Sequence, residues 1–307
     1  MRFATRKLRA LGSRKMRMLR IVPPTPQQDR DGLAIPILVR DVAPYVVEWL
    51  QFHHAAGARH FFIYDNGSTD DTLALLQPFV EQGLVTVLPW KLVARDAETG
   101  RQFNAQISAF AHAIMTFGMN FQRFAFIDID EFIVPKHHLT IMDAVYAAGN
   151  PVNLSLGWHM FGHSNHETSP LGGVIRNFTQ RARLPYKLPT RLLQYKCIVD
   201  PCEVTLIHHH EFETLTMRDN SSNAVGKVSP NGKRKSLDYF TSDNLQLNHY
   251  FCLSRQETDE KINRGSATFE TPEQHRERIL KFVREIENET EHDVSAIKFL
   301  ERSASKA

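Results

Sequence analysis

The sequence predicts an α/β fold in which a parallel sheet leads into a mixed-sheet extension. In the first half of the chain, four short apolar runs alternate with longer stretches of helical periodicity. Strands and helices that alternate in this way form parallel sheets with right-handed crossover connections. Beyond residue 150, strand-like runs follow one another with few helical stretches between them, which indicates mixed or antiparallel pairing.

The elements of the parallel half are predicted from their apolar runs and boundary residues. Pro44 suits the first turn of a helix that ends near Gly57. A second helix follows the cluster Ser68–Asp71, where we expect the hydroxyl of Ser68 to accept the amide hydrogen of Asp71. A third helix is expected over about 101–117. The strands of this half are predicted at 35–39, 60–64, 84–88 and 124–128.

The second half and both ends of the chain are predicted from the same signals. Residues 213–235 are poor in large apolar side chains, so they predict a long mobile loop. We expect a basic arm and linker over 1–30, a globular domain over 31–266, and a C-terminal helix and tail over 267–307. Strands are predicted at 152–156, 173–178, 192–199, 204–208 and 245–253, helices at 139–148, 255–264 and 273–287, and a frayed tail at 303–307.

Composition and charge limit the class of protein. With 307 residues, 42% of them hydrophobic and 23% charged, the chain can bury a large core without disulfide bonds or a structural metal. Its three cysteines, Cys197, Cys202 and Cys252, form no Cys-x-x-Cys pair, which favours buried thiols in a reducing compartment.

The net charge of +3 is distributed unevenly. Residues 1–20 hold eight Lys or Arg and no acidic residue, whereas the rest of the chain holds 29 basic and 34 acidic residues. The mildly acidic body argues against a nucleic-acid-binding face. The arm is either a solvated tail or a contact for anionic lipid head groups. Since no apolar stretch resembles an export signal or a membrane span, we expect a cytoplasmic protein, with the cytosolic face of a membrane as an alternative place.

The apolar run Phe124–Ile127 leads directly into Asp128 and Asp130. A strand that is apolar on both faces belongs inside a covered parallel sheet, where an unpaired charge is costly. Both carboxylates should therefore lie at its exposed carboxyl end, beside Arg40-Asp41 and Asp65-Asn66 from earlier strand ends. Carboxylates at such an edge bind a divalent cation that also contacts substrate phosphates. The alternative is a strand followed by an acidic turn.

A set of short sequence blocks is spread in order over about residues 31–266. They are Arg40-Asp41, Glu48-Trp49-Leu50-x-x-His53 with Gly57, Phe62–Asn66 with Ser68 and Asp70, Phe126–Phe132, Trp158-x-x-Phe161-Gly162, Lys196–Pro201, His208, and Asn248–Gly265 with its Lys261 and Arg264. Each block alone is weak, but their order and spacing together resemble GT-A fold glycosyltransferases of the family 2-like and family 92 (DUF23-type) group. The resemblance implies a Rossmann-like nucleotide-diphospho-sugar transferase fold.

The same resemblance implies roles for individual residues. The metal ion, Mn²⁺ or Mg²⁺, would be bound by Asp130 with His249, or with His208 in place of His249. A satisfied core histidine is the alternative for His249, and a surface tract is the alternative for His208. The nucleotide part of the donor would be bound by Arg40, Asp41, Asp65, Asn66, Asp128, Lys261 and Arg264.

Three of the donor residues also have a simpler interpretation. Asn66 can serve only to build a turn, where Asn is common, and we expect Asp65 to serve both turn and donor. Lys261 and Arg264 lie three residues apart on one helix face, and they either clamp the diphosphate or form an ordinary solvated face.

The acceptor side is predicted from residue chemistry. Lys196 lies in an apolar strand and must either extend to solvent or meet an anion, so we expect a substrate contact. Trp158 and Phe161 are expected to form a platform for a sugar ring, with a core role as the alternative. The general base is not assigned; its candidates are Glu131, His163, Glu167 and Glu211.

The function that we expect is metal-dependent transfer of a sugar, from a UDP-sugar or another nucleoside diphosphate sugar, to a hydroxyl of a glycan or lipid-linked acceptor, with inversion as the resemblance implies. A phosphatase of the haloacid dehalogenase type also places Asp-x-Asp after a strand, but there Thr or Val follows one residue later, whereas Glu131-Phe132 follows directly here. The non-enzymatic alternative is a glycan-binding protein on a decayed transferase fold. The donor sugar, acceptor, linkage and oligomeric state are not readable from the sequence.

Overall fold

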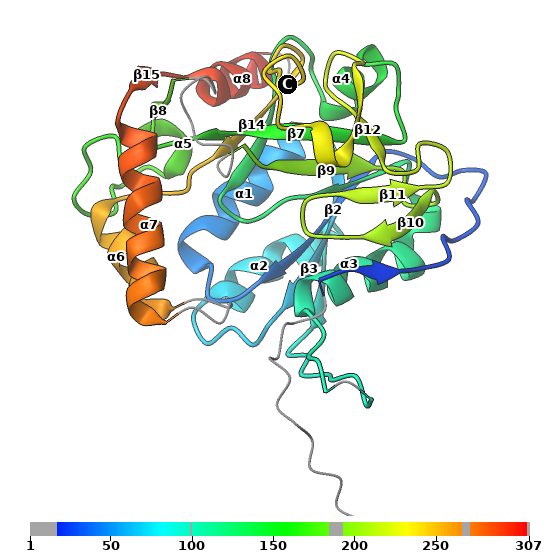
Figure 1. The fold of residues 1–307 in the computed structure, drawn as a ribbon. Helices are drawn as coiled ribbons and strands as arrows, with labels where there is room; N and C mark the ends of the chain where they lie inside the picture. Colours follow the sequence, from blue (N-terminus) through cyan, green and yellow to red (C-terminus); the bar gives the residue numbers. More distant parts are fainter. Residues whose placement is uncertain (1–16, 99, 184–192, 266–270, 306–307) are drawn as a thin grey trace, which may run out of the picture.

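The computed structural model describes residues 17–98, 100–183, 193–265 and 271–305. Its first half has the predicted alternation of strands and helices (Figure 1). The elements are β1 (Leu19–Arg20), β2 (Leu33–Val39), α1 (Ala43–Ala55), β3 (Ala58–Asp65), α2 (Thr72–Glu81), β4 (Val85–Pro89), α3 (Ala105–Phe117), the 3-10 helix η1 (Gly118–Asn120) and β5 (Arg123–Phe126).

The second half is richer in short strands. Its elements are β6 (Glu131–Pro135), α4 (Ile141–Ala147), β7 (Asn153–Met160), α5 (Val174–Asn177), β8 (Gln180–Ala182), β9 (Tyr195–Val199), β10 (Val204–Ile207), β11 (Phe212–Thr214), β12 (Asn220–Ser222), β13 (Val228–Pro230), the 3-10 helix η2 (Asn231–Lys233), β14 (Leu245–His249), α6 (Arg255–Arg264), α7 (Pro272–Glu287), β15 (Thr290–His292) and α8 (Ser295–Ala304).

The parallel half of the sheet is confirmed. Strand β2 pairs in parallel with both β3 and β5, and β3 pairs in parallel with β4. These four strands therefore end at one edge, and the segments that follow β2, β3 and β5 lie along it. This is the edge at which open α/β sheets bind ligands.

The predicted mixed extension is also confirmed. Strand β9 runs antiparallel between β5 and β7, whereas β14 pairs in parallel with β7 and antiparallel with β6. In the register of β5 and β9, Phe126 lies opposite Cys197. In the register of β14 and β6, His249 lies opposite Glu131. These two pairings bring Lys196 and His249 to the segment that follows β5.

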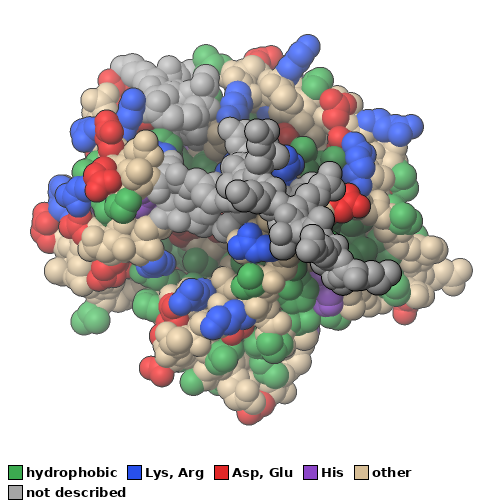
Figure 2. All heavy atoms as spheres, turned by 60° about the horizontal axis from the view of Figure 1, so that its bottom comes forward, with side chains coloured by type: hydrophobic (Ala, Val, Ile, Leu, Met, Phe, Trp, Pro, Cys, Tyr) green, Lys and Arg blue, Asp and Glu red, His purple; other side chains and the backbone are tan. Residues whose placement is uncertain are grey.

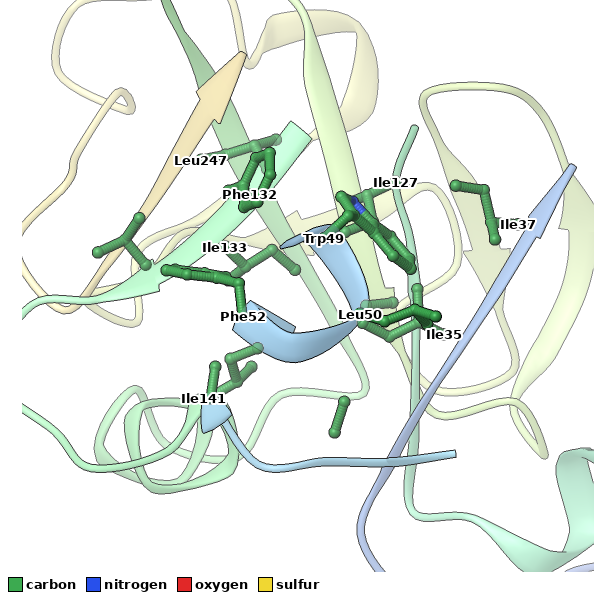
Figure 3. Close-up of a cluster of buried hydrophobic side chains, with 14 of the residues drawn as sticks. Ile35, Ile37, Trp49, Leu50, Phe52, Ile127, Phe132, Ile133, Ile141 and Leu247 are labelled. Carbon is green, nitrogen blue, oxygen red and sulfur yellow. The ribbon is translucent and has the colours of Figure 1, made fainter. Parts of the chain in front are cut away.

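The central strands are apolar on both faces, as the sequence predicts. Along β2, Ile35 and Ile37 face the cluster under α1, while Ala34 faces the cluster under α3. Such alternation follows from the two-residue period of a strand. Figure 3 shows the first cluster, in which Trp49 and Phe52 of α1 meet side chains of β2, β6 and β14. The core therefore holds β5 and β6 rigidly on either side of the Asp-x-Asp segment.

Several predicted elements were wrong, and tertiary contacts explain why. The strand predicted at 173–178 is instead helix α5 (Val174–Asn177), because the carboxylate of Glu48 accepts the amide hydrogens of Val174 and Ile175. The hydroxyl of Ser68 does not cap α2 but accepts the amide hydrogen of Asp41. Helix α8 was not predicted, and it includes the first two residues of the frayed tail expected at 303–307.

The segment 213–235 is not the expected loop, because it contains β12, β13 and η2. Buried amide side chains replace the apolar contacts that it lacks. Asn153 donates to the carbonyl groups of Phe212 and Asn220, and Asn223 donates to the carbonyl group of Tyr239. The polar composition of this segment therefore reflects a hydrogen-bonded structure.

The remaining global predictions concern thiols and membranes. Cys197, Cys202 and Cys252 are buried and free, as expected. No helix in the described part of the chain combines the length and the apolar character needed to cross a membrane. Most of the basic arm, residues 1–16, lies outside the described residues, as do the end of the predicted central domain at 266 and the first residue of the strand predicted at 192–199.

Candidate active site

The Asp-x-Asp segment is a tight turn between β5 and β6. The carbonyl group of Asp128 accepts the amide hydrogen of Glu131 at 3.1 Å, and the side chain of Glu131 accepts the amide hydrogen of Asp128 at 2.9 Å. The carbonyl group of Asp130 accepts the amide hydrogen of Tyr250, which follows β14, at 2.8 Å. The turn is therefore fixed from both sides, and Asp128 and Asp130 keep exposed fractions of 39% and 22%.

Lys196 meets anions of the protein itself. Its ammonium group lies 2.7 Å from Asp128 and 3.8 Å from Glu131, and its side chain is only 2% exposed. Burial lowers the pKa of Lys196, but Asp128 and Glu131 outweigh burial and raise it above its usual value. Lys196 thus meets an anion, which was one of the two expected outcomes, and this anion is Asp128; a direct contact of Lys196 with substrate stays a prediction.

The two acidic partners of Lys196 differ in their electrostatic environment. Burial raises the pKa of Asp128, but the ammonium group of Lys196 lowers that pKa by more than burial raises it, so the net shift is downward. Burial dominates at Glu131, which is fully enclosed, and its pKa lies well above the usual value. One carboxylate oxygen of Glu131, Oε1, is buried without a hydrogen-bond partner. Gln106, which the sequence analysis missed, donates to Asp128 at 2.8 Å from the first turn of α3.

Asp130 lies next to a histidine and a lysine. Its carboxylate is 3.4 Å from Nε2 of His249 and 3.5 Å from the ammonium group of Lys261. Burial raises the pKa of Asp130, but His249 and Lys261 lower it more, so the net shift is downward. Lys261 reaches the site because its ammonium group donates to the carbonyl group of Phe251 at 2.7 Å and lies over the Phe251 ring. The structure thus brings three predicted residues together.

Two aromatic side chains line the same region. The ring of Trp158 lies 4.4 Å from that of His249 and 5.4 Å from that of His210. The indole nitrogen of Trp158 is buried without a hydrogen-bond partner. Nδ1 of His210 donates to the carbonyl group of Tyr195 at 3.1 Å, which leaves Nε2 as the acceptor nitrogen. Burial, together with Lys196, lowers the pKa of His210 to about 3, so His210 is neutral.

The ends of β2 and β3 form a neighbouring cluster. Asp41 has a left-handed backbone conformation (φ 51°), and its carboxylate accepts the amide hydrogen of Thr69 at 2.7 Å. The carboxylate of Asp65 accepts the amide hydrogens of Gly67 and Ser68. Both carboxylates therefore build the loops of this edge, which matches the turn-building half of the dual role expected for Asp65. Asn66 is the residue directly after Asp65, at the start of the loop that follows β3. Arg40 directly precedes Asp41 and is exposed.

Three other predicted residues lie differently from the expectation. Phe161 is completely buried against Tyr250, so its assignment to an acceptor platform was wrong and it is a core residue. His208 lies 3.9 Å from Glu211. The histidine that contacts Trp158 is His210, two residues after His208. Arg264 is exposed at the end of α6.

The four candidates for the general base lie in different environments. Glu131 belongs to the cluster but is fully enclosed. Glu167 and Glu211 form ion pairs with Arg255 and Arg234, at 3.0 and 3.4 Å. His163 is enclosed between Glu287 and Thr258. Each candidate is thus already engaged with a neighbour or buried, and the base stays unassigned.

The surface near the lower end of the molecule has mixed charge. Figure 2 shows Lys and Arg side chains interspersed with Asp and Glu on the face that lies at the bottom of Figure 1. No broad field of positive charge appears on the visible part of this face.

Comparison with solved structures yields distant neighbours. A crystal structure of Staphylococcus aureus TarS 1-349 in complex with UDP-GlcNAc is 15% identical over 55% of this chain and 45% of that chain, with a TM-score of 0.34. UDP-glucose pyrophosphorylase complexed with UDP-glucose is 8% identical over 90% of this chain and 98% of that chain, with a TM-score of 0.25. Superpositions this loose add nothing to the assignment of the site.

Sequence comparison is more informative. A glycosyltransferase family 92 protein of Ricinus communis is 27% identical over 246 residues, which are 77% of this chain and 38% of that protein. A family 92 protein of Oryza sativa subsp. japonica is 26% identical over 58% of this chain and 29% of its own length. The chain thus spans less than half the length of these relatives. The sequence model of glycosyltransferase family 92 matches residues 37–280. The α/β fold with a mixed-sheet extension is the architecture that the sequence predicts, and the chain belongs to glycosyltransferase family 92.

Proposed function

We propose that this chain is a metal-dependent, inverting glycosyltransferase. It would move a sugar from a nucleoside diphosphate sugar, with UDP-sugars as the first candidates, to a hydroxyl of a glycan or lipid-linked acceptor. The observation that carries the proposal is the convergence of Asp130, His249 and Lys261 at the carboxyl end of the central strand. Membership of family 92 supports glycosyl transfer as the type of reaction.

The residues at Asp130 fit a bound Mn²⁺ or Mg²⁺. In the described part of the chain, no group of three or more His, Cys, Asp or Glu is arranged to enclose a metal ion. Asp130 and His249 instead offer one carboxylate and one imidazole at a partly exposed position. Mg²⁺ is usually bound by only one or two carboxylates and completes its coordination with water and substrate phosphates. When bound, the cation would neutralise negative charge on the departing diphosphate.

Lys196 and Lys261 are placed for different tasks. Lys196 is buried, and its ion pair fixes the carboxylate of Asp128 at the edge of the site. Lys261 is partly exposed next to Asp130, and its ammonium group is held by the Phe251 carbonyl group. An ammonium group in this position can form charge-assisted hydrogen bonds with diphosphate oxygens. Lys261 would therefore stabilise the leaving group, while Lys196 keeps the donor-binding carboxylate in place.

The acceptor would lie on the side of Trp158. Its side chain is partly exposed, and an aromatic ring is suited to packing against the C–H face of a sugar. The tilted packing of Trp158 on His249 places the indole beside the proposed metal ligand. This arrangement supports contact between Trp158 and the sugar or the acceptor.

The test is calorimetric titration with UDP in the presence and absence of Mn²⁺, with GDP and CMP run alongside. We expect UDP to bind at least ten-fold more tightly with Mn²⁺, and Asp130→Asn to abolish that difference. Asp243→Asn, which changes an exposed aspartate before β14, is the matched control and should behave as wild type. Equal UDP affinity with and without Mn²⁺ would contradict the proposal. Glycan binding without any effect of nucleotide would favour a non-catalytic binding protein.

A further inference from the structure

A second concave site lies away from the Asp-x-Asp turn. It is a cavity of about 460 Å³ between the end of β6 and the start of α8, near the top of Figure 1. We call it the α8 pocket. Lys136 and Glu131 lie five residues apart, which corresponds to about 16 Å along an extended strand. The α8 pocket is therefore separate from the proposed metal site. The side chains that matter for its chemistry are those of Lys136, His292, Asp293, Lys298 and Arg302.

The charge of the α8 pocket is not balanced by the protein. Asp293 is the single acidic residue among those that line it, and its carboxylate is already bound by Arg181 at 2.6 Å and by the amide of Ser295 at 2.8 Å. Among the described residues, no salt bridge involves Lys136, Lys298 or Arg302. Three cationic side chains thus face one cavity without an anion of their own.

The hydrogen bonds of these cations are made to neutral oxygens. The ammonium group of Lys136 donates to the side chain of Gln246 at 3.0 Å, and the guanidinium group of Arg302 donates to the carbonyl group of Pro135 at 2.8 Å. Burial lowers the pKa of Lys136, and the nearby charges of Lys298 and Arg302 lower it further, against the opposing effect of Asp293. A bound anion would relieve this repulsion.

The start of α8 adds to the positive potential. The helix has ten residues, and its N-cap residue, Val294, offers no capping side chain, whereas the amide of Ser295 is bound by the carboxylate of Asp293. Val294 and Ser295 both line the cavity. The N-terminus of a helix carries a partial positive charge and favours anions. The helix terminus and the three cations therefore act on the same space.

We propose that the α8 pocket binds a phosphate ester or a sulfate ester, such as a charged substituent on a glycan. A tetrahedral oxyanion has enough oxygens to pair with several cations and amides at once, and the cavity leaves room for a sugar attached to it. Since the site lies apart from Asp130, it would recognise a charged group beyond the reacting sugar.

The test is calorimetric titration of the full chain with inorganic phosphate, sulfate, glucose 1-phosphate and, as the uncharged control, glucose. EDTA is present throughout, so that binding at the proposed metal site does not contribute. Lys298→Glu is the informative variant, because Lys298 is exposed and its side chain has no hydrogen bond to lose among the described residues. Lys281→Glu, at an exposed position on α7, is the matched control.

We expect saturable binding of phosphate, sulfate or glucose 1-phosphate, a loss of at least ten-fold in affinity in Lys298→Glu, and no change in Lys281→Glu. Whichever of phosphate and sulfate binds with the higher affinity identifies the type of ester that the pocket prefers. Asp130→Asn should leave this binding intact, which separates the proposal from that for the metal site. The proposal is overturned if none of the three anions binds saturably, or if Lys298→Glu binds them as wild type does.

Discussion

Replacement of Lys196 by methionine tests the electrostatic design of the site. The side chain of Lys196 is 2% exposed, and its ammonium group lies 2.7 Å from Asp128 and 3.8 Å from the fully buried Glu131. Breaking a buried ion pair costs about 3–5 kcal/mol, because the remaining charge stays buried without a partner. Asp128 is 39% exposed, so water screens part of that cost. We expect Lys196→Met to lower the free energy of unfolding by about 2–3 kcal/mol.

The loss is measured by thermal unfolding at pH 7, where it corresponds to a fall in Tm of about 4–10 °C. Lys281→Met, at an exposed position on α7, is the control and should stay within about 0.5 kcal/mol of wild type. The double variant Lys196→Met with Glu131→Gln should be more stable than Lys196→Met alone, because no uncompensated carboxylate stays enclosed. An unchanged Tm in Lys196→Met would refute the reasoning.

Three further predictions concern stability and binding. Trp49→Phe removes a buried hydrogen bond at 2.9 Å to the carbonyl group of Glu131 and leaves a small void, so urea unfolding should show a loss of about 2–4 kcal/mol; a loss below about 1 kcal/mol would contradict this. His53 is buried and neutral, and burial lowers its pKa to about 3, below the value of about 6.5 in the unfolded chain. The contribution of His53 to the free energy of unfolding is therefore fully present above pH 6.5 and is lost as the pH falls towards 3. Between pH 7 and pH 5 this contribution falls by about 2 kcal/mol, and urea unfolding of His53→Gln should show a correspondingly smaller loss; equal losses in both proteins would exclude His53 as the cause. Trp158→Phe removes an indole N–H that has no hydrogen-bond partner, so Tm should stay within about 2 °C of wild type. The rate of transfer to the acceptor should fall about ten-fold. A lower Tm with an unchanged transfer rate would show that Trp158 serves only the core.

The parallel sheet was predictable because its signals are local. Each central strand is an apolar run that ends in polar residues, and the order of strands and helices determines which ends share an edge. The short elements of the C-terminal half were less predictable, since they depend on contacts with residues that are distant in the sequence. Helix α5 begins where Glu48, more than 120 residues earlier, accepts two amides. The folded segment 213–235 depends on buried Asn153 and Asn223.

In the candidate site too, some features could be predicted from the sequence and others depend on tertiary contacts. The sequence blocks placed His249 and Lys261 with Asp130, and the structure brings these three together. The partner of Lys196 was not readable, because a buried lysine in a strand meets an anion that only the strand register identifies; here it is Asp128. Phe161 was misassigned because sequence spacing does not tell which aromatic ring of a block turns into the core.

The most direct test of the central claim is release of nucleotide from donor sugars. Purified protein is incubated with a panel of UDP-, GDP- and CMP-sugars, a mixture of glycan acceptors and Mn²⁺, and free nucleotide is measured over time. We predict release from at least one nucleoside diphosphate sugar that stops when Mn²⁺ is chelated, falls at least 100-fold in Asp130→Asn, and is unchanged in Asp243→Asn. Release that continues unchanged in Asp130→Asn would contradict the assignment of this carboxylate to the metal site.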